Sequence, residues 1–298
     1  MRLPVRWWGG GRVELASPVL TATLALVPPG VRVVQVASPL SDRDHRRLGR
    51  WFDDHPQVAL RVYHHGLGPE GDLSFLRHYP RLSGLSIDSL HEQVVLSPRS
   101  LEHLPPTLRE LSLEGRARDL RPLAALDRLE HLKLRSVTAD VSPLTALSQL
   151  RALEIRLGGI TDLSAVPIIG AITYLEIWLV RGLADLGFIA DMGHLEHLVL
   201  QALRNVRALP DLSRCGALER VHLETMKGLS DLWPLATAPV LDHVRLVDLR
   251  HLCPQDLMPL KHCRALQHVA VGLGSDRKNL AALSLLGIPG DYGGHVLA

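Results

Sequence analysis

A short apolar pattern recurs along the chain and constrains its fold more than any other sequence feature. The pattern is apolar-x-x-apolar-x-apolar, and nine copies begin at Leu82, Leu108, Leu129, Leu150, Ile172, Leu195, Leu218, Leu241 and Leu266. Two weaker copies precede them, VRVVQV at 31–36 and QVALRV at 57–62. Consecutive copies lie 21 to 26 residues apart, a period typical of solenoids that stack one supersecondary unit on the next. The sequence therefore predicts an elongated repeat fold.

A second apolar series follows most of these copies, with a spacing of three. Examples are LRPLAAL at 120–126 and VSPLTAL at 141–147. This spacing predicts a 3₁₀ or short helical return segment, in which the recurrent Pro loses no ladder hydrogen bond. In the early units, SDRDHRRLGRWF at 41–52 begins with Ser41 and has Asp44 three residues later, an approximate capping box that predicts an α-helix. The segment 72–79 is expected to be a shorter equivalent.

Units such as LRALEIRLGGITDLSAV and LERVHLETMKGLSDLWPL resemble leucine-rich repeats of the short bacterial type. The later units also resemble the repeats in the sensor regions of intracellular immune receptors. This resemblance covers about residues 31–271 and implies an α/β leucine-rich repeat solenoid. Such a fold has a curved parallel sheet on its concave side and 3₁₀ or short α-helical returns on its convex side.

One feature departs from the family pattern. The Asn that usually turns the chain after each strand is replaced by Val137, Gly158, Val180, Leu203, Met226 and Leu249. We therefore expect apolar packing and other backbone bonds to hold the turn.

The repeat pattern also predicts the domain organisation. Residues 1–30 are expected to form an N-terminal cap, and 31–272 a solenoid of about ten or eleven repeats with α-helical returns in the first ones. Residues 273–298 are expected to form a C-terminal cap that ends in a frayed, Gly-rich tail, GIPGDYGGHVLA. The initiating Met and the lack of a linker favour a whole gene product.

Composition excludes several classes of function. The net charge is +2 and Lys and Arg form no long run, which argues against nucleic acid as the main partner. No stretch of about 18 apolar residues predicts a membrane span, and no secretory signal is recognisable. The three cysteines lack C-x-x-C spacing, so a reducing cytoplasm is the simplest interpretation. Cys215 and Cys263 occupy equivalent core positions in their units.

The side chains between the apolar positions are expected to point out of the sheet, because neighbouring strand residues face opposite ways. The third column along the solenoid reads Gly84, Glu110, His131, Ala152, Tyr174, His197, Arg220, His243 and His268. The fifth column reads Ser86, Ser112, Lys133, Glu154, Glu176, Val199, His222, Arg245 and Ala270.

Aromatic residues are rare in this chain, yet Tyr174 and Trp178 fall in exposed columns of one unit. Trp, Tyr and Arg are enriched at interface hot spots. We therefore predict a partner-binding surface centred on Tyr174, consisting of Tyr174, Trp178, Glu154, Arg156, Glu176, His197, Gln201, Arg220, His222, Glu224, His243 and Arg245.

Histidine beside an acidic residue recurs, as in LEHLKL at 129–134 and LEHLVL at 195–200. The copy at 101–104 is out of register and is expected to lie in a return segment. His222, His243 and His268 lie on neighbouring strands about 4.8 Å apart, so a metal site is one alternative. The other alternative is that these histidines are only polar residues at solvent-facing positions of an exposed sheet. Clustered histidines would also make binding sensitive to pH between about 5 and 7.

No catalytic motif is present: we find no G-x-S-x-G, no H-E-x-x-H and no Walker loop. WWGGG at 7–11 is expected to be a turn beside two cap-packing tryptophans. We assign no catalytic residue, metal or cofactor, and predict a non-enzymatic, cytoplasmic scaffold that binds a protein on its concave face, with no nucleic acid and no membrane involved. Two alternatives remain open: the sensor subunit of an immune-like or signalling system with a separate effector, and a histidine-rich metal or small-ligand site with a catalytic role.

Overall fold

The structure, a computed structural model of the full chain, describes residues 5–7, 10–36, 38–63, 67, 71–89 and 95–291, with only the backbone for 5–7. The chain divides into two compact units, Met1–Leu150 (unit 1) and Arg151–Ala298 (unit 2). Each unit is described by itself. The predicted packing of Trp7 and Trp8 lies outside the described side chains.

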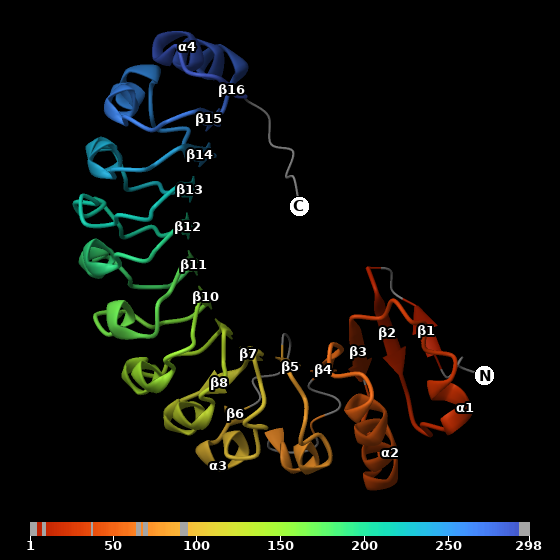
Figure 1. The fold of residues 1–298 in the computed structure, drawn as a ribbon. Helices are drawn as coiled ribbons and strands as arrows, with labels where there is room; N and C mark the ends of the chain where they lie inside the picture. The colour runs from red at the N-terminus through yellow and green to blue at the C-terminus, as the bar shows by residue number, and fades with distance from the viewer. Residues whose placement is uncertain are drawn as a thin grey trace. The chain divides into compact units, whose positions relative to one another are not determined.

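Unit 1 is a sheet with return segments packed against one face (Figure 1). Its strands, in spatial order, are β1 (Val5–Trp7), β2 (Arg12–Leu15), β3 (Val33–Val36), β4 (Ala59–Tyr63), β5 (Gly84–Asp88), β7 (Glu110–Glu114) and β9 (His131–Arg135). β1 is antiparallel to β2, and the strands that follow are parallel. The repeat pattern did not predict β2, which pairs with β3 in the register of the ladder. A small second sheet pairs β6 (Val95–Leu96) with β8 (Arg116–Ala117).

The return segments of unit 1 include both α-helices and 3₁₀ helices. They are α1 (Thr21–Leu24), α2 (Asp42–Asp53), η3 (Ser74–His78), α3 (Pro98–Leu101), η4 (Arg121–Ala125) and η5 (Ser142–Ala146). The predicted helix at 41–52 is confirmed, with a capping box in which Ser41 Oγ accepts a hydrogen bond from the Asp44 backbone N–H at 3.2 Å. The copy of LEHL at 101–104 does lie in a return, at the end of α3.

The expectation of a shorter α-helix at 72–79 is wrong, because η3 is a 3₁₀ helix. Leu73, Leu76 and Tyr79 are all buried. In a helix with three residues per turn, side chains spaced by three lie on one face. In an α-helix, with 3.6 residues per turn, they would be spread over more of its surface. Asp72 also fixes the entry by accepting a hydrogen bond from the Ser74 backbone N–H at 2.8 Å.

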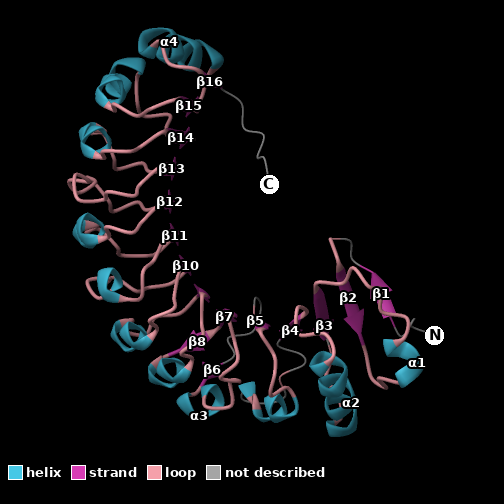
Figure 2. Ribbon diagram, viewed as in Figure 1, coloured by secondary structure: helices cyan, strands magenta, loops and turns pink. Residues whose placement is uncertain are grey.

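Unit 2 repeats a strand followed by a return segment (Figure 2). Its strands are β10 (Ala152–Arg156), β11 (Tyr174–Trp178), β12 (His197–Gln201), β13 (Arg220–Glu224), β14 (His243–Val247), β15 (His268–Val271) and β16 (Gly290–Asp291), all parallel. Its returns are η6 (Val166–Ile168), η7 (Gly187–Asp191), η8 (Trp233–Thr237) and η9 (Pro254–His262), followed by the helix α4 (Asp276–Leu286). The fully described return between β12 and β13 contains no helix.

The strand register of unit 2 aligns the predicted columns. Tyr174, His197, Arg220, His243 and His268 are successive Cα partners across five strands. The alternate positions face the core, and Leu175 and Leu198 have no exposed surface. Burial of one such side chain contributes about 1.5–3 kcal/mol, so the ladder fixes which residues face outward. The α/β solenoid with 3₁₀ returns that the sequence predicted is confirmed.

The turn after each strand is made without Asn, as the sequence indicated. Six residues at the equivalent position have positive φ angles of 51–60°, and none is Gly: Ser136, Leu157, Leu179, Ala202, Thr225 and Asp248. This conformation costs a non-glycine residue about 1–2 kcal/mol. Backbone bonds offset it, since the Leu179 N–H donates to Gln201 O and the Ala202 N–H to Glu224 O, both at 2.9 Å. The residue that follows each turn, such as Val180, is buried.

The C-terminal part of unit 2 is built onto the last repeat. Ser275 caps α4, Gly287 ends it in the left-handed conformation, and Gly290 and Asp291 then pair with Val269 and Ala270. The rest of the predicted frayed tail, residues 292–298, lies outside the described residues. The assignment of 1–30 and 273–298 as caps stays a prediction. Within the described part of the chain, no helix has both the length and the apolar character that a membrane crossing requires.

Candidate functional site

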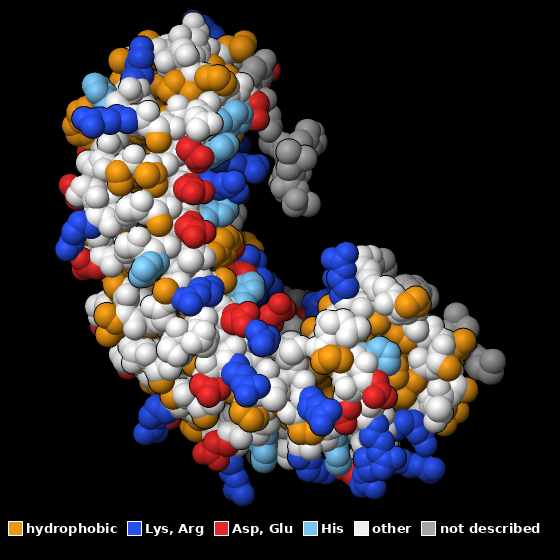
Figure 3. Space-filling model, in the orientation of Figure 1, with side chains coloured by type: hydrophobic (Ala, Val, Ile, Leu, Met, Phe, Trp, Pro, Cys, Tyr) orange, Lys and Arg blue, Asp and Glu red, His pale blue; other side chains and the backbone are white. Residues whose placement is uncertain are grey.

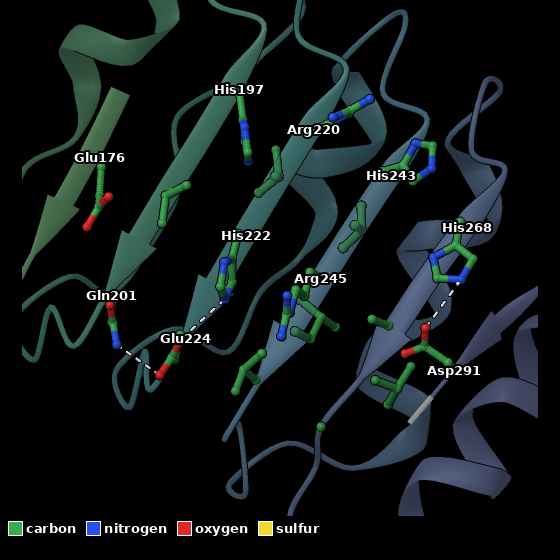
Figure 4. Close-up of a pocket in the computed structure, with 18 of the residues that line it drawn as sticks. Glu176, His197, Gln201, Arg220, His222, Glu224, His243, Arg245, His268 and Asp291 are labelled. Atoms are coloured by element: carbon green, nitrogen blue, oxygen red, sulfur yellow. Dashed lines mark hydrogen bonds and ion pairs between the residues drawn. The ribbon is translucent and has the colours of Figure 1, made fainter. Parts of the chain in front are cut away.

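A hollow lies on the sheet face of unit 2 and runs across strands β11 to β15 (Figure 4). Its volume is about 770 Å³. The third, fifth and seventh columns line it, and the opposite face of the same strands holds the leucine ladder. In Figure 3, histidine and charged side chains gather along this side of unit 2. We call this feature the hollow.

Nine of the twelve predicted partner-binding residues line the hollow: Tyr174, Glu176, His197, Gln201, Arg220, His222, Glu224, His243 and Arg245. The other three, Glu154, Arg156 and Trp178, are not among its lining residues. The prediction omitted Val199, Ala270, His268 and Asp291, which do line it. His268 could have been found from the third column, whereas Asp291 enters through β16, which the repeat pattern does not cover.

One end of the face is closed by a network of four side chains, Glu154, Arg156, Tyr174 and Glu176, which we call the closed network. The Arg156 guanidinium lies 2.8 Å from Glu154 Oε2 and 2.6 Å from Glu176 Oε2. The Tyr174 hydroxyl donates a hydrogen bond to Glu176 at 3.0 Å. Both glutamates are buried. Burial, and then the neighbouring Glu176 charge, raise the pKa of Tyr174, so its hydroxyl stays a donor.

Trp178 belongs to the same end of the face. The Arg156 guanidinium carbon lies 5.7 Å from the centre of its ring, within the range of a cation–π contact. The predicted centre of the binding surface, Tyr174, is therefore already engaged with groups of this protein through its hydroxyl.

Arg220 on β13 and Arg245 on β14, unlike Arg156, are not paired with any carboxylate that the structure describes. We call them the open arginines. Among the described residues, neither makes an ion pair or a side-chain hydrogen bond. Arg220 is exposed and Arg245 is half-buried. In Figure 4 dashed lines join Gln201, Glu224 and His222, and join His268 to Asp291, but none reaches either arginine.

His222 lies beside Arg245 in the cross-strand register. Its Nε2 is 3.3 Å from Glu224 Oε2, but the pair lacks hydrogen-bond geometry. Burial lowers the pKa of His222 to about 4, and the charge of Arg245 adds to the shift. His222 is therefore neutral between pH 5 and 7, and the predicted pH sensitivity of binding stays a prediction. Burial and Arg220 lower the pKa of His197 in the same direction.

The far end of the third column holds two more histidines. His243 and His268 lie with ring centres 5.8 Å apart. Each has its own carboxylate, since His243 Nδ1 is 2.7 Å from Asp242 Oδ1 and His268 Nε2 is 3.6 Å from Asp291 Oδ2. The part of the chain that the structure describes has no group of three or more His, Cys, Asp or Glu side chains arranged to hold a metal ion.

Several charged side chains on the equivalent face of unit 1 are paired with a neighbouring side chain. Arg61 Nε donates to Asp88 at 2.5 Å, and Gln35 Nε2 donates to Glu14 at 2.8 Å. Arg135 Nε lies 3.2 Å from Glu114 Oε1. Arg61, Glu14 and Glu114 are thus paired within unit 1, whereas Arg245 on the fifth column of unit 2 has no ion-pair partner among the described residues.

The cysteines take no part in either face. Cys215 and Cys263 are buried free thiols, as their repeat positions predicted. Cys215 Sγ donates to Ile189 O at 3.2 Å. Burial raises the pKa of each thiol to about 11, which makes both poor nucleophiles at neutral pH.

No family model matches this sequence, and no curated protein matches it. Two solved structures from Listeria monocytogenes are similar to the chain. An internalin (inlF) is 16% identical, covering 93% of this chain and 90% of that one, with a TM-score of 0.46. An internalin C2 (inlC2) is 24% identical, covering 65% of this chain and 73% of that one, with a TM-score of 0.38. From the strand register, the buried ladder and the 3₁₀ returns described above, we conclude that this chain has a leucine-rich repeat fold.

Proposed function

We propose that this chain is a non-enzymatic scaffold that binds another protein through the sheet face of unit 2. The observation that supports the proposal is the hollow, which is open to solvent and extends over five strands. A ligand site for a small molecule normally encloses most of the ligand. An open hollow lined from five parallel strands suits a polypeptide segment better.

The repeat scaffold also supplies rigidity. The Cα partners along β11 to β15 are fixed by backbone pairing, so the side chains of the third and fifth columns are held in rows before a partner arrives. Little conformational entropy is then lost on docking. The mixture of carboxylate, imidazole and guanidinium groups contributes orientation and selectivity more than affinity. A cytoplasmic location, favoured by the cysteine pattern, belongs to the same proposal.

Site-specific photo-crosslinking tests this function. A photoreactive amino acid replaces Ala270, which lines the hollow, or Ala236, which lies on η8 among the returns. Crosslinked proteins from the native host are identified by mass spectrometry, and the affinity of the purified partner is then measured.

We expect a defined partner to crosslink through position 270 and not through 236, and to bind the intact chain in purified form. Crosslinks that form equally at both positions, or at 236 alone, would show that the proposed face is wrong. A partner with an ATPase effector domain would identify the sensor-subunit alternative, which uses the same surface.

A further inference from the structure

We propose that the hollow binds an extended protein segment through a single acidic side chain, whose carboxylate pairs with Arg245 and reaches Arg220. This inference rests on the proposed function and specifies the chemistry of the partner.

Arg245 is the starting point. Its side chain is half-buried in the floor of the hollow, and it makes no ion pair within the described residues. A guanidinium has five N–H donors arranged to hold a carboxylate with two parallel bonds. Partial burial removes some of its water without supplying a partner, so a carboxylate that arrives there gains more than it would at an exposed arginine.

The surroundings of Arg245 strengthen such a pair. Its cross-strand neighbours in the fifth column are His222 and Ala270, and Val199 lies one strand further along. Val199 and Ala270 are apolar, and His222 is neutral at pH 7 because its pKa is about 4. An electrostatic contact in apolar surroundings is stronger than the same contact in water.

Arg220 supplies a second donor. It is the Cα partner of His243, which precedes Arg245 by two residues on β14, so the two open arginines are diagonal neighbours. Diagonal positions on one sheet face lie about 7–8 Å apart, which long side chains span. One carboxylate placed between them can therefore contact both guanidinium groups.

The same hollow excludes a run of acidic residues. Glu224 and Asp291 also line it, and each would repel a carboxylate placed nearby. Glu224 already accepts a hydrogen bond from Gln201 Nε2 at 2.8 Å. Five strands span about 19 Å, a length that about six extended residues cover. The expected segment is thus about six residues long, with one Asp or Glu and with neutral or basic neighbours.

A displayed library of random peptides tests this inference. The library is selected against the full chain, and the dissociation constant of each selected peptide is measured by fluorescence anisotropy. The variants are Arg245→Gln and Arg220→Gln. The matched control is Arg264→Gln, which removes the same charge at an exposed site outside the hollow. Unfolding curves of all variants show whether each one folds.

We expect one acidic residue to be enriched at a fixed position. The dissociation constant of such peptides should rise about 10-fold or more in Arg245→Gln, in line with loss of a charge-assisted bond. It should rise about 3-fold in Arg220→Gln, whose site is exposed, and change less than about 2-fold in Arg264→Gln. Replacing the peptide's acid by Gln should weaken binding to the intact chain and have little effect with Arg245→Gln.

Several outcomes would overturn the inference. These are selected peptides without an acid, acidic peptides that bind Arg245→Gln as tightly as the intact chain, and poly-acidic peptides that bind best. Tighter binding by more than about 10-fold when phosphoserine replaces the acid would point instead to phosphate recognition. The proposed function is tested separately. If the partner crosslinked through position 270 binds Arg245→Gln unchanged, only the acidic-segment inference fails; if no specific crosslink forms there, the function fails as well.

Discussion

The closed network on β10 and β11 and the open arginines on β13 and β14 lie on the same face of the same sheet, yet only the closed network has its charges paired within the part of the chain that the structure describes. Arg156 is shared between two buried carboxylates, whereas Arg245 has no ion-pair partner among the described residues. A repeat scaffold fixes where a side chain lies, and its neighbours one strand away decide what it does. We infer that the closed network stabilises the fold and the open arginines remain available for a ligand.

The largest expected effect is on stability at the closed network. Arg156→Met leaves Glu154 and Glu176 buried without their shared cation, and we expect a loss of about 3 kcal/mol in the free energy of unfolding. Arg245→Met removes no ion pair, so its effect should stay within about 0.5 kcal/mol. Denaturant unfolding of both variants checks the difference.

A charge-neutral background serves as the control for this prediction. In the Glu154→Gln/Glu176→Gln variant the carboxylates are absent, and Arg156→Met should then cost less than half as much as in the natural chain. Equal losses from Arg156→Met and Arg245→Met would contradict the distinction between the two regions.

The second prediction concerns the pH dependence of stability that arises from His222, which lies beside Arg245. The folded-state pKa of His222 is about 4, below its unfolded value of about 6.5. Between these values the unfolded chain binds the proton, so stability is full above about pH 6.5 and falls as the pH drops towards 4. His222→Gln should remove about 1–2 kcal/mol of this loss.

Arg245→Gln sharpens the same measurement. Arg245 is the second cause of the lowered pKa, after burial, so its removal should make the pH dependence shallower than in the natural chain. Unfolding curves recorded at several pH values between 7 and 4 follow the effect. An unchanged slope in both variants would mean that His222 is not the group that titrates.

The smallest predicted effect is a change in stability that comes from backbone strain alone. Ala202 follows β12, between the two regions, and has a φ of 55°, which glycine adopts without strain. We expect Ala202→Gly to stabilise the chain by up to about 1 kcal/mol, whereas Ala236→Gly in η8 should destabilise it by a similar amount. Thermal unfolding distinguishes the two. Destabilisation by both glycines would show that the turn is not strained.

The apolar period was sufficient to predict the repeat register, because a residue such as Leu175 has no exposed surface in a solenoid and cannot change face without exposing the ladder. It also placed Tyr174, His197 and His222 on the sheet face. Asp291 was not predictable in this way, since it reaches the hollow through β16, beyond the last repeat.

The pairing of side chains on the sheet face could not be predicted from the apolar repeat either. The columns show that Arg156 and Arg245 both face outward, but not that one is shared by two glutamates and the other is free of them. That difference depends on which residues lie one strand away and on their rotamers. The predicted emphasis on Tyr174 followed from residue type alone, and its bond to Glu176 was visible only in three dimensions.

A structure of the complex with the crosslinked partner tests the central claim most directly. The account predicts a partner carboxylate oxygen within about 3 Å of the Arg245 guanidinium, with the segment lying across β11 to β15 and the Arg156 pairs to Glu154 and Glu176 unchanged. A partner bound on the 3₁₀ returns, or one that crosses the hollow and leaves Arg245 unpaired, would contradict it.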